Sequence, residues 1–64
     1  MSLKTEADKY REEAERCIQN AIVKFAHVVS NNVEGWGQYN KQYQERVKTA
    51  LEKLREARTE LETY

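Results

Sequence analysis

The chain has 64 residues, 34% of them charged, with 11 basic residues against 11 acidic ones. A chain of this length forms one domain at most and buries a small core, so we expect it to be supported by self-association or by a partner chain. The even charge balance excludes the basic surface that nucleic acids and anionic membranes attract, and the single cysteine and single histidine exclude an internal disulfide and a self-contained zinc site.

The first predicted element is a helix over residues 5–30. Thr5 followed three residues later by Asp8 is typical of a helix N-terminus, where each side chain bonds the backbone of the other. Apolar residues then recur every three or four positions, which is the period of a helix face. They form two stripes, the first of Leu3, Ala7, Tyr10, Ala14, Cys17, Ala21 and Val28, and the second of Ile18, Ile22, Phe25 and Val29.

The second half of this helix is its most apolar part. Nine of the fourteen residues in 17–30 are apolar, and only Lys24 is formally charged. At 100° per residue these side chains cover about half of the helix circumference, which is wider than the stripe of roughly 100° on an ordinary one-sided helix. One partner helix cannot cover that width, so the segment predicts a second contact surface.

A turn is predicted at residues 31–37. The sequence contains no proline, and its two glycines, Gly35 and Gly37, follow a run of serine and asparagine near the middle of the chain. Residues of these types favour left-handed backbone and turns. Because the connection is short, we expect the helices on either side of it to be antiparallel neighbours.

The second predicted helix covers residues 38–63 and has a heptad pattern. Its two seams consist of Trp36, Tyr43, Ala50, Ala57 and Tyr64, and of Val47, Leu54 and Leu61, with Tyr39 and Leu51 beside them. Alanine recurs at the same seven-residue spacing in both helices. Small side chains let two helices approach closely, so we expect the alanine stripes to form the seam on which the two helices pair; the high helix propensity of alanine is an equally good explanation of the spacing and supports the same hairpin. Residues 1–64 are therefore predicted to form one all-α domain, a two-helix antiparallel coiled-coil hairpin that assembles into a four-helix bundle by dimerisation or partner binding.

Candidate catalytic and metal-binding residues lack the neighbours that such chemistry needs. His27 has no cysteine or carboxylate at ligand spacing, and Cys17 lies on an apolar stripe, where we expect a buried structural thiol. The sequence around Gly35 and Gly37 lacks the further glycine and the Lys-Ser/Thr pair of a phosphate-binding loop. We therefore predict no enzymatic activity, no cofactor and no bound metal.

The excess apolar surface predicts a protein–protein interaction or oligomerisation module. The alternative is that the aromatic side chains near the turn fold back and close the core by themselves. The partner is expected to be the chain itself or another protein, with no nucleic acid and no membrane involved. The sequence lacks a secretory signal and an apolar run of about 20 residues, so a cytoplasmic location is expected. The predicted contact residues are those of the wide apolar side and the turn-proximal aromatics, namely Ile18, Ile22, Phe25, Val29, Trp36, Tyr39 and Tyr43.

An alternative interpretation comes from the overall plan of the chain. A helix, a polar turn with glycines, and a tyrosine-rich start to the second helix, with the sequence QYNKQYQ at residues 38–44, follow one another within 64 residues. In this plan the chain resembles the small co-chaperones of type III secretion needle subunits. That resemblance implies an escort that binds a larger helical-repeat chaperone through one apolar face and keeps a helical partner soluble.

Overall fold

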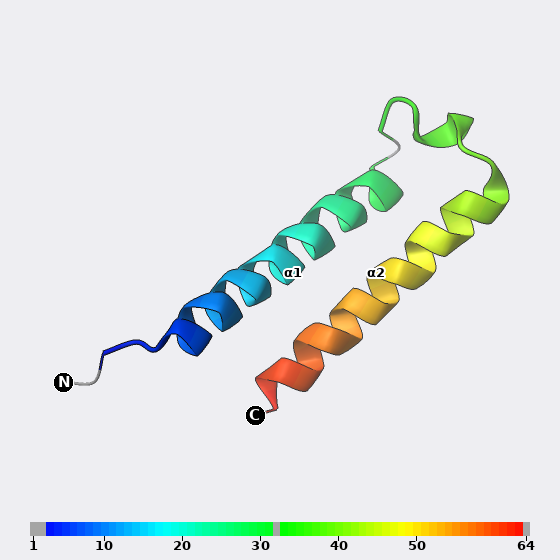
Figure 1. Ribbon diagram of the computed structural model, residues 1–64. Helices are drawn as coiled ribbons and strands as arrows, with labels where there is room; N and C mark the ends of the chain where they lie inside the picture. Colours follow the sequence, from blue (N-terminus) through cyan, green and yellow to red (C-terminus); the bar gives the residue numbers. More distant parts are fainter. Residues whose placement is uncertain (1–2, 32, 64) are drawn as a thin grey trace.

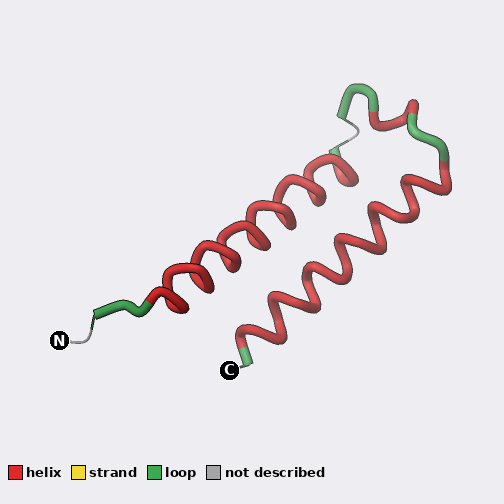
Figure 2. The backbone as a smooth tube through the Cα atoms, in the orientation of Figure 1, coloured by secondary structure: helices red, strands yellow, loops and turns green. Residues whose placement is uncertain are grey.

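The computed structural model describes residues 3–31 and 33–63, which form two long helices joined by a turn (Figures 1 and 2). Helix α1 spans Glu6–Ser30, a short 3₁₀ helix η1 spans Trp36–Gln38, and α2 spans Lys41–Glu62. The two long helices run antiparallel and pack against each other, and no strand occurs in either described range. An all-helical hairpin is thus confirmed; Asn32 of the predicted turn and Tyr64 of the predicted heptad series lie outside the described residues.

The N-terminus of α1 has the predicted cap. The Thr5 hydroxyl accepts a hydrogen bond from the Asp8 backbone N–H at 3.2 Å, and the Thr5 backbone N–H donates to the Asp8 carboxylate at 3.2 Å. These bonds satisfy donors that the first turn of a helix leaves free. The hydrogen bonds from the backbone and then the side chain of Thr5 lower the pKa of Asp8, with a smaller contribution from Arg11.

The turn is longer than predicted, because α2 begins at Lys41 and not at residue 38. Gly35 has a φ of +89°, in the left-handed region, and leads into η1. Asn40 then caps α2 by accepting a hydrogen bond from the Tyr43 backbone N–H at 2.8 Å. An asparagine cap fixes the residue at which a helix begins. The residues before Asn40 are therefore not part of α2, and residues 36–38 form a separate 3₁₀ turn.

The core between the helices is small. Of the described residues, three are buried, namely Ile22 from α1 and Val47 and Leu51 from α2. Half-buried apolar side chains extend this seam in both directions along the helices; they are Ile18, Val29 and Leu54. Toward the chain ends the contact becomes polar, where the Arg58 guanidinium donates a hydrogen bond to the Gln19 side-chain oxygen at 3.0 Å.

The predicted alanine seam is wrong. The alanines at 7, 14, 50 and 57 are exposed, and Cys17 is exposed as well. On each helix the inward-facing stripe is the one that follows the alanine stripe by one residue; it contains Glu15, Ile22 and Val29 on α1 and Gln44, Leu51 and Arg58 on α2. Burying large side chains such as Ile22 and Leu51 removes more apolar surface from water than burying alanine, which favours this pairing.

The hairpin is extended and has a large surface for its mass. Its radius of gyration is 15.4 Å, against about 11 Å for a compact domain of 64 residues. Its accessible surface is 5778 Å², against about 4300 Å² for a compact monomer of 7.6 kDa. A single pair of helices therefore leaves apolar surface uncovered. Within the described ranges, neither long helix has an apolar stretch that could cross a membrane.

Candidate functional site

Most of the uncovered apolar side chains of the two helices lie on the same side of the hairpin; Val23 is an exception. On both helices the alanine stripe precedes the inward-facing stripe by one residue, which turns it by about 100° around the helix axis. Because the helices run antiparallel and face each other, this rotation of about 100° brings the alanine stripes of both helices to the same side of the hairpin. We call this side the open face; it contains Tyr10, Ala14, Cys17, Ala21, Phe25 and Val28 of α1, Trp36 and Tyr39 of the turn, and Tyr43, Ala50 and Ala57 of α2.

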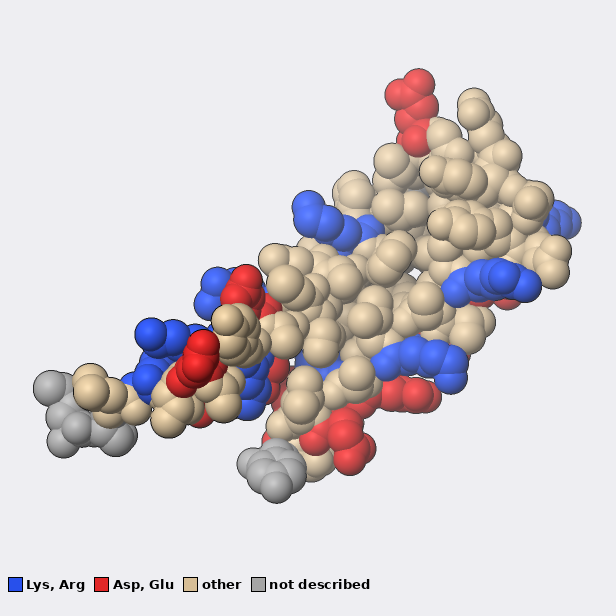
Figure 3. Space-filling model, in the orientation of Figure 1, with Lys and Arg blue, Asp and Glu red and all other residues tan. Residues whose placement is uncertain are grey.

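The open face carries large apolar groups in contact with solvent. Tyr10, Tyr39 and Tyr43 have 66%, 54% and 51% of their surface exposed, and Phe25 is also exposed. In the space-filling view, uncharged atoms form a continuous expanse at the turn end of the hairpin, whereas many charged side chains gather toward the chain ends (Figure 3). On the face shown in Figure 3, the turn end is therefore the half with fewer charged side chains, and it carries the exposed Phe25, Tyr39 and Tyr43.

Four aromatic side chains form a depression at the turn end. Trp36 meets Tyr39 edge-on with ring centroids 5.9 Å apart, and the ring centroid of Tyr39 is 5.3 Å from that of Tyr43. The depression has a volume of about 160 Å³. We call it the aromatic pocket; its lining consists of Phe25, Val28, Trp36, Tyr39, Tyr43 and Val47.

Hydrogen bonds from α2 hold the backbone of the residues that carry two of these aromatic rings. The Gln44 amide donates hydrogen bonds to the carbonyl oxygens of Trp36, at 2.9 Å, and Tyr39, at 3.2 Å. Tyr43 stands on the first turn of α2, which the Asn40 cap fixes. Since Gln44 lies on the inward-facing stripe, one side chain links the packing of the helices to the conformation of the turn.

The structure divides the seven predicted contact residues into two groups. Phe25, Trp36, Tyr39 and Tyr43 meet in the aromatic pocket. Ile22 is buried between the helices, and half-buried positions on or beside the same seam are occupied by Ile18 and Val29.

The sequence interpretation did not include Tyr10, Ala14 and Ala57 in the contact set. They lie on the open face because their stripe is not the one that pairs the helices. The seven-residue spacing of these residues indicates a contact surface, but the sequence interpretation used that spacing to predict the seam between the two helices.

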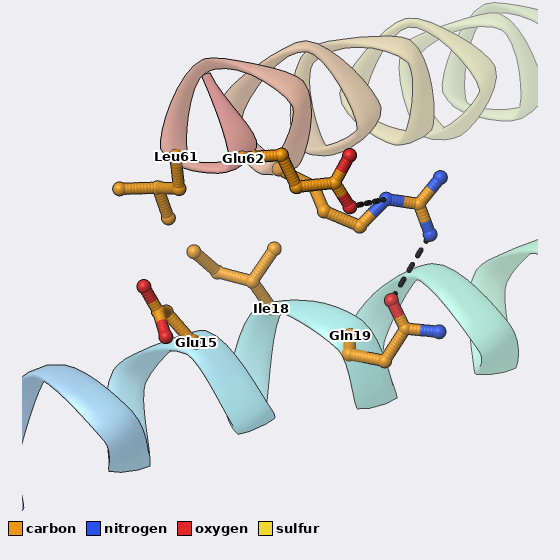
Figure 4. Close-up of a pocket in the computed structure, with 6 residues that line it drawn as sticks. Glu15, Ile18, Gln19, Leu61 and Glu62 are labelled. Atoms are coloured by element: carbon orange, nitrogen blue, oxygen red, sulfur yellow. Dashed lines mark hydrogen bonds and ion pairs between the residues drawn. The ribbon is translucent and has the colours of Figure 1, made fainter. Parts of the chain in front are cut away.

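A second depression lies between the helices near the chain ends (Figure 4). Its volume is about 310 Å³, and Ile18 and Leu61 form its apolar part. The Arg58 guanidinium reaches across it, with the Gln19 oxygen 3.0 Å away and the Glu62 carboxylate 3.9 Å away. The depression marks where the apolar seam ends and polar contacts replace it.

The single histidine of the chain bonds the C-cap asparagine of the same helix. The His27 ring nitrogen Nδ1 lies 3.0 Å from the side-chain amide of Asn31, which also donates to the His27 carbonyl oxygen at 3.2 Å. In residues 3–31 and 33–63, no three histidine, cysteine or carboxylate side chains come together as metal ligands would. The geometry that stands out in this chain is therefore the open face.

Comparison of the chain with protein-family models, with curated proteins and with solved structures finds no significant match.

Proposed function

We propose that this chain is a non-enzymatic interaction module that binds another helical protein, or itself, through the open face. The observation that carries the proposal is the gathering of Phe25, Trp36, Tyr39 and Tyr43 in one solvent-exposed pocket. Contiguous apolar patches of this kind are typical of protein interfaces. Tyrosine and tryptophan are also the residues that most often dominate interface energetics.

The small core gives a second argument. Burying one large apolar side chain contributes about 1.5–3 kcal/mol, and three side chains of the described part are buried. A hairpin of this kind is marginal in water, as small chains with a single thin core are in general. A partner that covers the open face would supply the missing apolar burial, so binding and folding stability are expected to be linked.

The test is a pair of aspartate variants on opposite sides of α1. Phe25→Asp introduces a charge into the aromatic pocket. Val23→Asp introduces the same charge at a site that is 56% exposed and, by the helical period, lies away from both α2 and the open face. Each variant is compared with the wild type by sedimentation at micromolar concentration and by capture of binding proteins from a cell extract.

We expect Phe25→Asp to abolish association and Val23→Asp to leave it intact, because an unpaired charge is costly to bury in an apolar contact. Circular dichroism at high protein concentration shows whether each variant keeps its helices. Association that survives in a folded Phe25→Asp variant, or is lost equally in both variants, would overturn the assignment of the open face.

A further inference from the structure

We propose that the partner on the open face is a second copy of this chain, packed head to tail, so that the turn end of each copy lies over the chain ends of the other. This proposal rests on the proposed function, because it uses the same face. It goes beyond it in naming the occupant and the orientation.

Two stacked hairpins related by a two-fold axis can be arranged in two ways. If the axis runs along the helices, turn lies over turn and α1 of one copy faces α2 of the other. If the axis crosses the helices, turn lies over chain ends, α1 faces α1, and α2 faces α2. Both arrangements give four-helix bundles with antiparallel neighbours, so apolar contact alone does not distinguish them.

The charges along the edges of the open face do distinguish them. The helical period places six charged side chains on its two outer edges, away from the seam between the helices. They are Glu6, Glu13 and Lys24 on α1, and Arg46, Lys53 and Glu60 on α2. On each helix the basic members lie nearer the turn and the acidic members nearer the chain ends.

All six are exposed, and within the described part of the chain none of their side chains makes a hydrogen bond or an ion pair. The ion pairs of this hairpin, such as Arg11 with Glu15 at 3.2 Å, use other residues. The edge charges are therefore available to a second copy. Turn over turn would bring like charges together, whereas head to tail brings basic edges over acidic ones.

One relative position of the two copies, or register, pairs basic with acidic side chains on both helices. The midpoint between Glu13 and Lys24 lies at residues 18–19, and the midpoint between Lys53 and Glu60 lies at residues 56–57. These two midpoints are at nearly the same height in the hairpin, because Gln19 hydrogen-bonds Arg58 across the seam. One two-fold axis through this height therefore pairs Lys24 with Glu13 and Lys53 with Glu60 at the same time.

The shape of the hairpin fits the same register. Glu15 lines one depression with Leu61 and Glu62, so the first turns of α1 project beyond the end of α2. In the head-to-tail register, this projecting segment of the second copy lies over the aromatic pocket. It offers Tyr10, which is 66% exposed, and small side chains such as Ala14 beside it, so bulky groups of one copy meet small groups of the other.

The test reverses one edge charge and then restores the pair. Lys24→Glu places a carboxylate beside Glu13 of the second copy twice, once on each side of the axis. Exposed pairs have modest energies, so we expect dimer dissociation to become about tenfold more favourable, measured by sedimentation equilibrium at low salt. The double variant Glu13→Lys/Lys24→Glu swaps the charges and is expected to return to within about twofold of the wild type.

Arg55→Glu is the matched control. Lys53 and Arg55 flank Leu54 of the seam, so Arg55 lies on the side of α2 opposite to Lys53 and away from the open face. Arg55 is exposed and has no ion pair in the described residues. We expect it to leave dimerisation unchanged. Tighter dimerisation of Lys24→Glu would show the turn-over-turn arrangement and overturn the head-to-tail one.

A wild type that stays monomeric at all concentrations would overturn pairing with a second copy. The proposed function would then stand if another protein is captured by the wild type and by Val23→Asp but not by Phe25→Asp. The absence of both self-association and such capture would end both proposals.

Discussion

Gly35 is the residue on which the turn depends. Its φ of +89° lies in the region that side chains with a Cβ rarely adopt. An added Cβ would meet no atom within 4 Å, so the requirement for glycine is one of backbone conformation and not of space. Gly37, two residues later, also has open space around it but does not have a positive φ.

The two glycines therefore form a matched pair for mutation. Gly35→Ala is expected to lower the free energy of unfolding by about 1 kcal/mol, the cost of left-handed backbone for a residue with a Cβ. Gly37→Ala is expected to be neutral or stabilising by up to about 1 kcal/mol, because it restricts the unfolded chain. Thermal unfolding followed by circular dichroism measures both, and equal effects of the two substitutions would contradict the role of Gly35.

Asp8 makes the α1 cap sensitive to acid. Its pKa is lowered in the folded chain by hydrogen bonds from Thr5. A group with a lowered folded pKa contributes stability above its unfolded pKa, and that contribution is lost as the pH falls through the folded value. For Asp8 the loss begins near pH 4 and continues below it.

We expect the thermal midpoint of the wild type to fall more steeply between pH 4 and pH 2 than that of Asp8→Asn, which cannot titrate at this position. Glu12, whose pKa is also lowered, chiefly by a hydrogen bond from Lys4, titrates in both proteins, and Asp8→Asn removes only the minor coulombic contribution by which Asp8 raises that pKa. Parallel pH profiles of the two proteins would show that the cap contact does not form in solution.

At the scale of the helices, the important feature is that each of them has two apolar stripes. The stripe with the larger side chains faces the other helix and includes Ile22 and Leu51, while the alanine-rich stripe faces solvent. Polar members of the inward stripe are accommodated at its two ends: Gln44 bonds the turn, and Arg58 bonds Gln19. The seam is therefore apolar in its middle and polar at both ends.

Two valines test which stripe pairs the helices. Val47 is 8% exposed in the seam, and Val23 is 56% exposed on the outer side of α1. Val47→Ala is expected to lower the free energy of unfolding by about 2 kcal/mol through lost burial and the cavity left behind. Val23→Ala is expected to have little effect or to stabilise α1 slightly, because alanine has the higher helix propensity. Chemical denaturation of both variants gives the comparison, and similar losses would contradict the observed pairing.

At the scale of the whole molecule, the hairpin is a single layer of two helices (Figure 1), and its apolar side, the open face, is not covered by other described residues. Its extents are 52 × 21 × 16 Å, and its radius of gyration exceeds that of a compact domain of its length. Stacking a second layer of helices on the open face would thicken the molecule in its thinnest direction and cover the aromatic pocket. Two of the variants concern the whole molecule. Phe25→Asp tests whether the open face binds a partner, and Lys24→Glu tests how two copies are oriented on that face.

The sequence by itself determined the two helices, the Thr5 cap, the place of the turn and the apolar excess around Phe25. These features depend on local hydrogen bonds and on the period of one helix, which neighbouring residues specify. It placed the start of α2 three residues early, because heptad spacing continues through Trp36 and does not reveal that Asn40 caps the helix.

Only the tertiary structure decided which stripe pairs the two helices and which remains open. Both stripes have the same period and lie about 100° apart, so periodicity cannot choose between them. The choice depends on how side chains from one helix fill the space beside the other, where Ile22 meets the seam of Val47 and Leu51. Because of that packing, the alanines lie on the open face and not in the predicted seam, on the same side of the hairpin as the aromatic pocket.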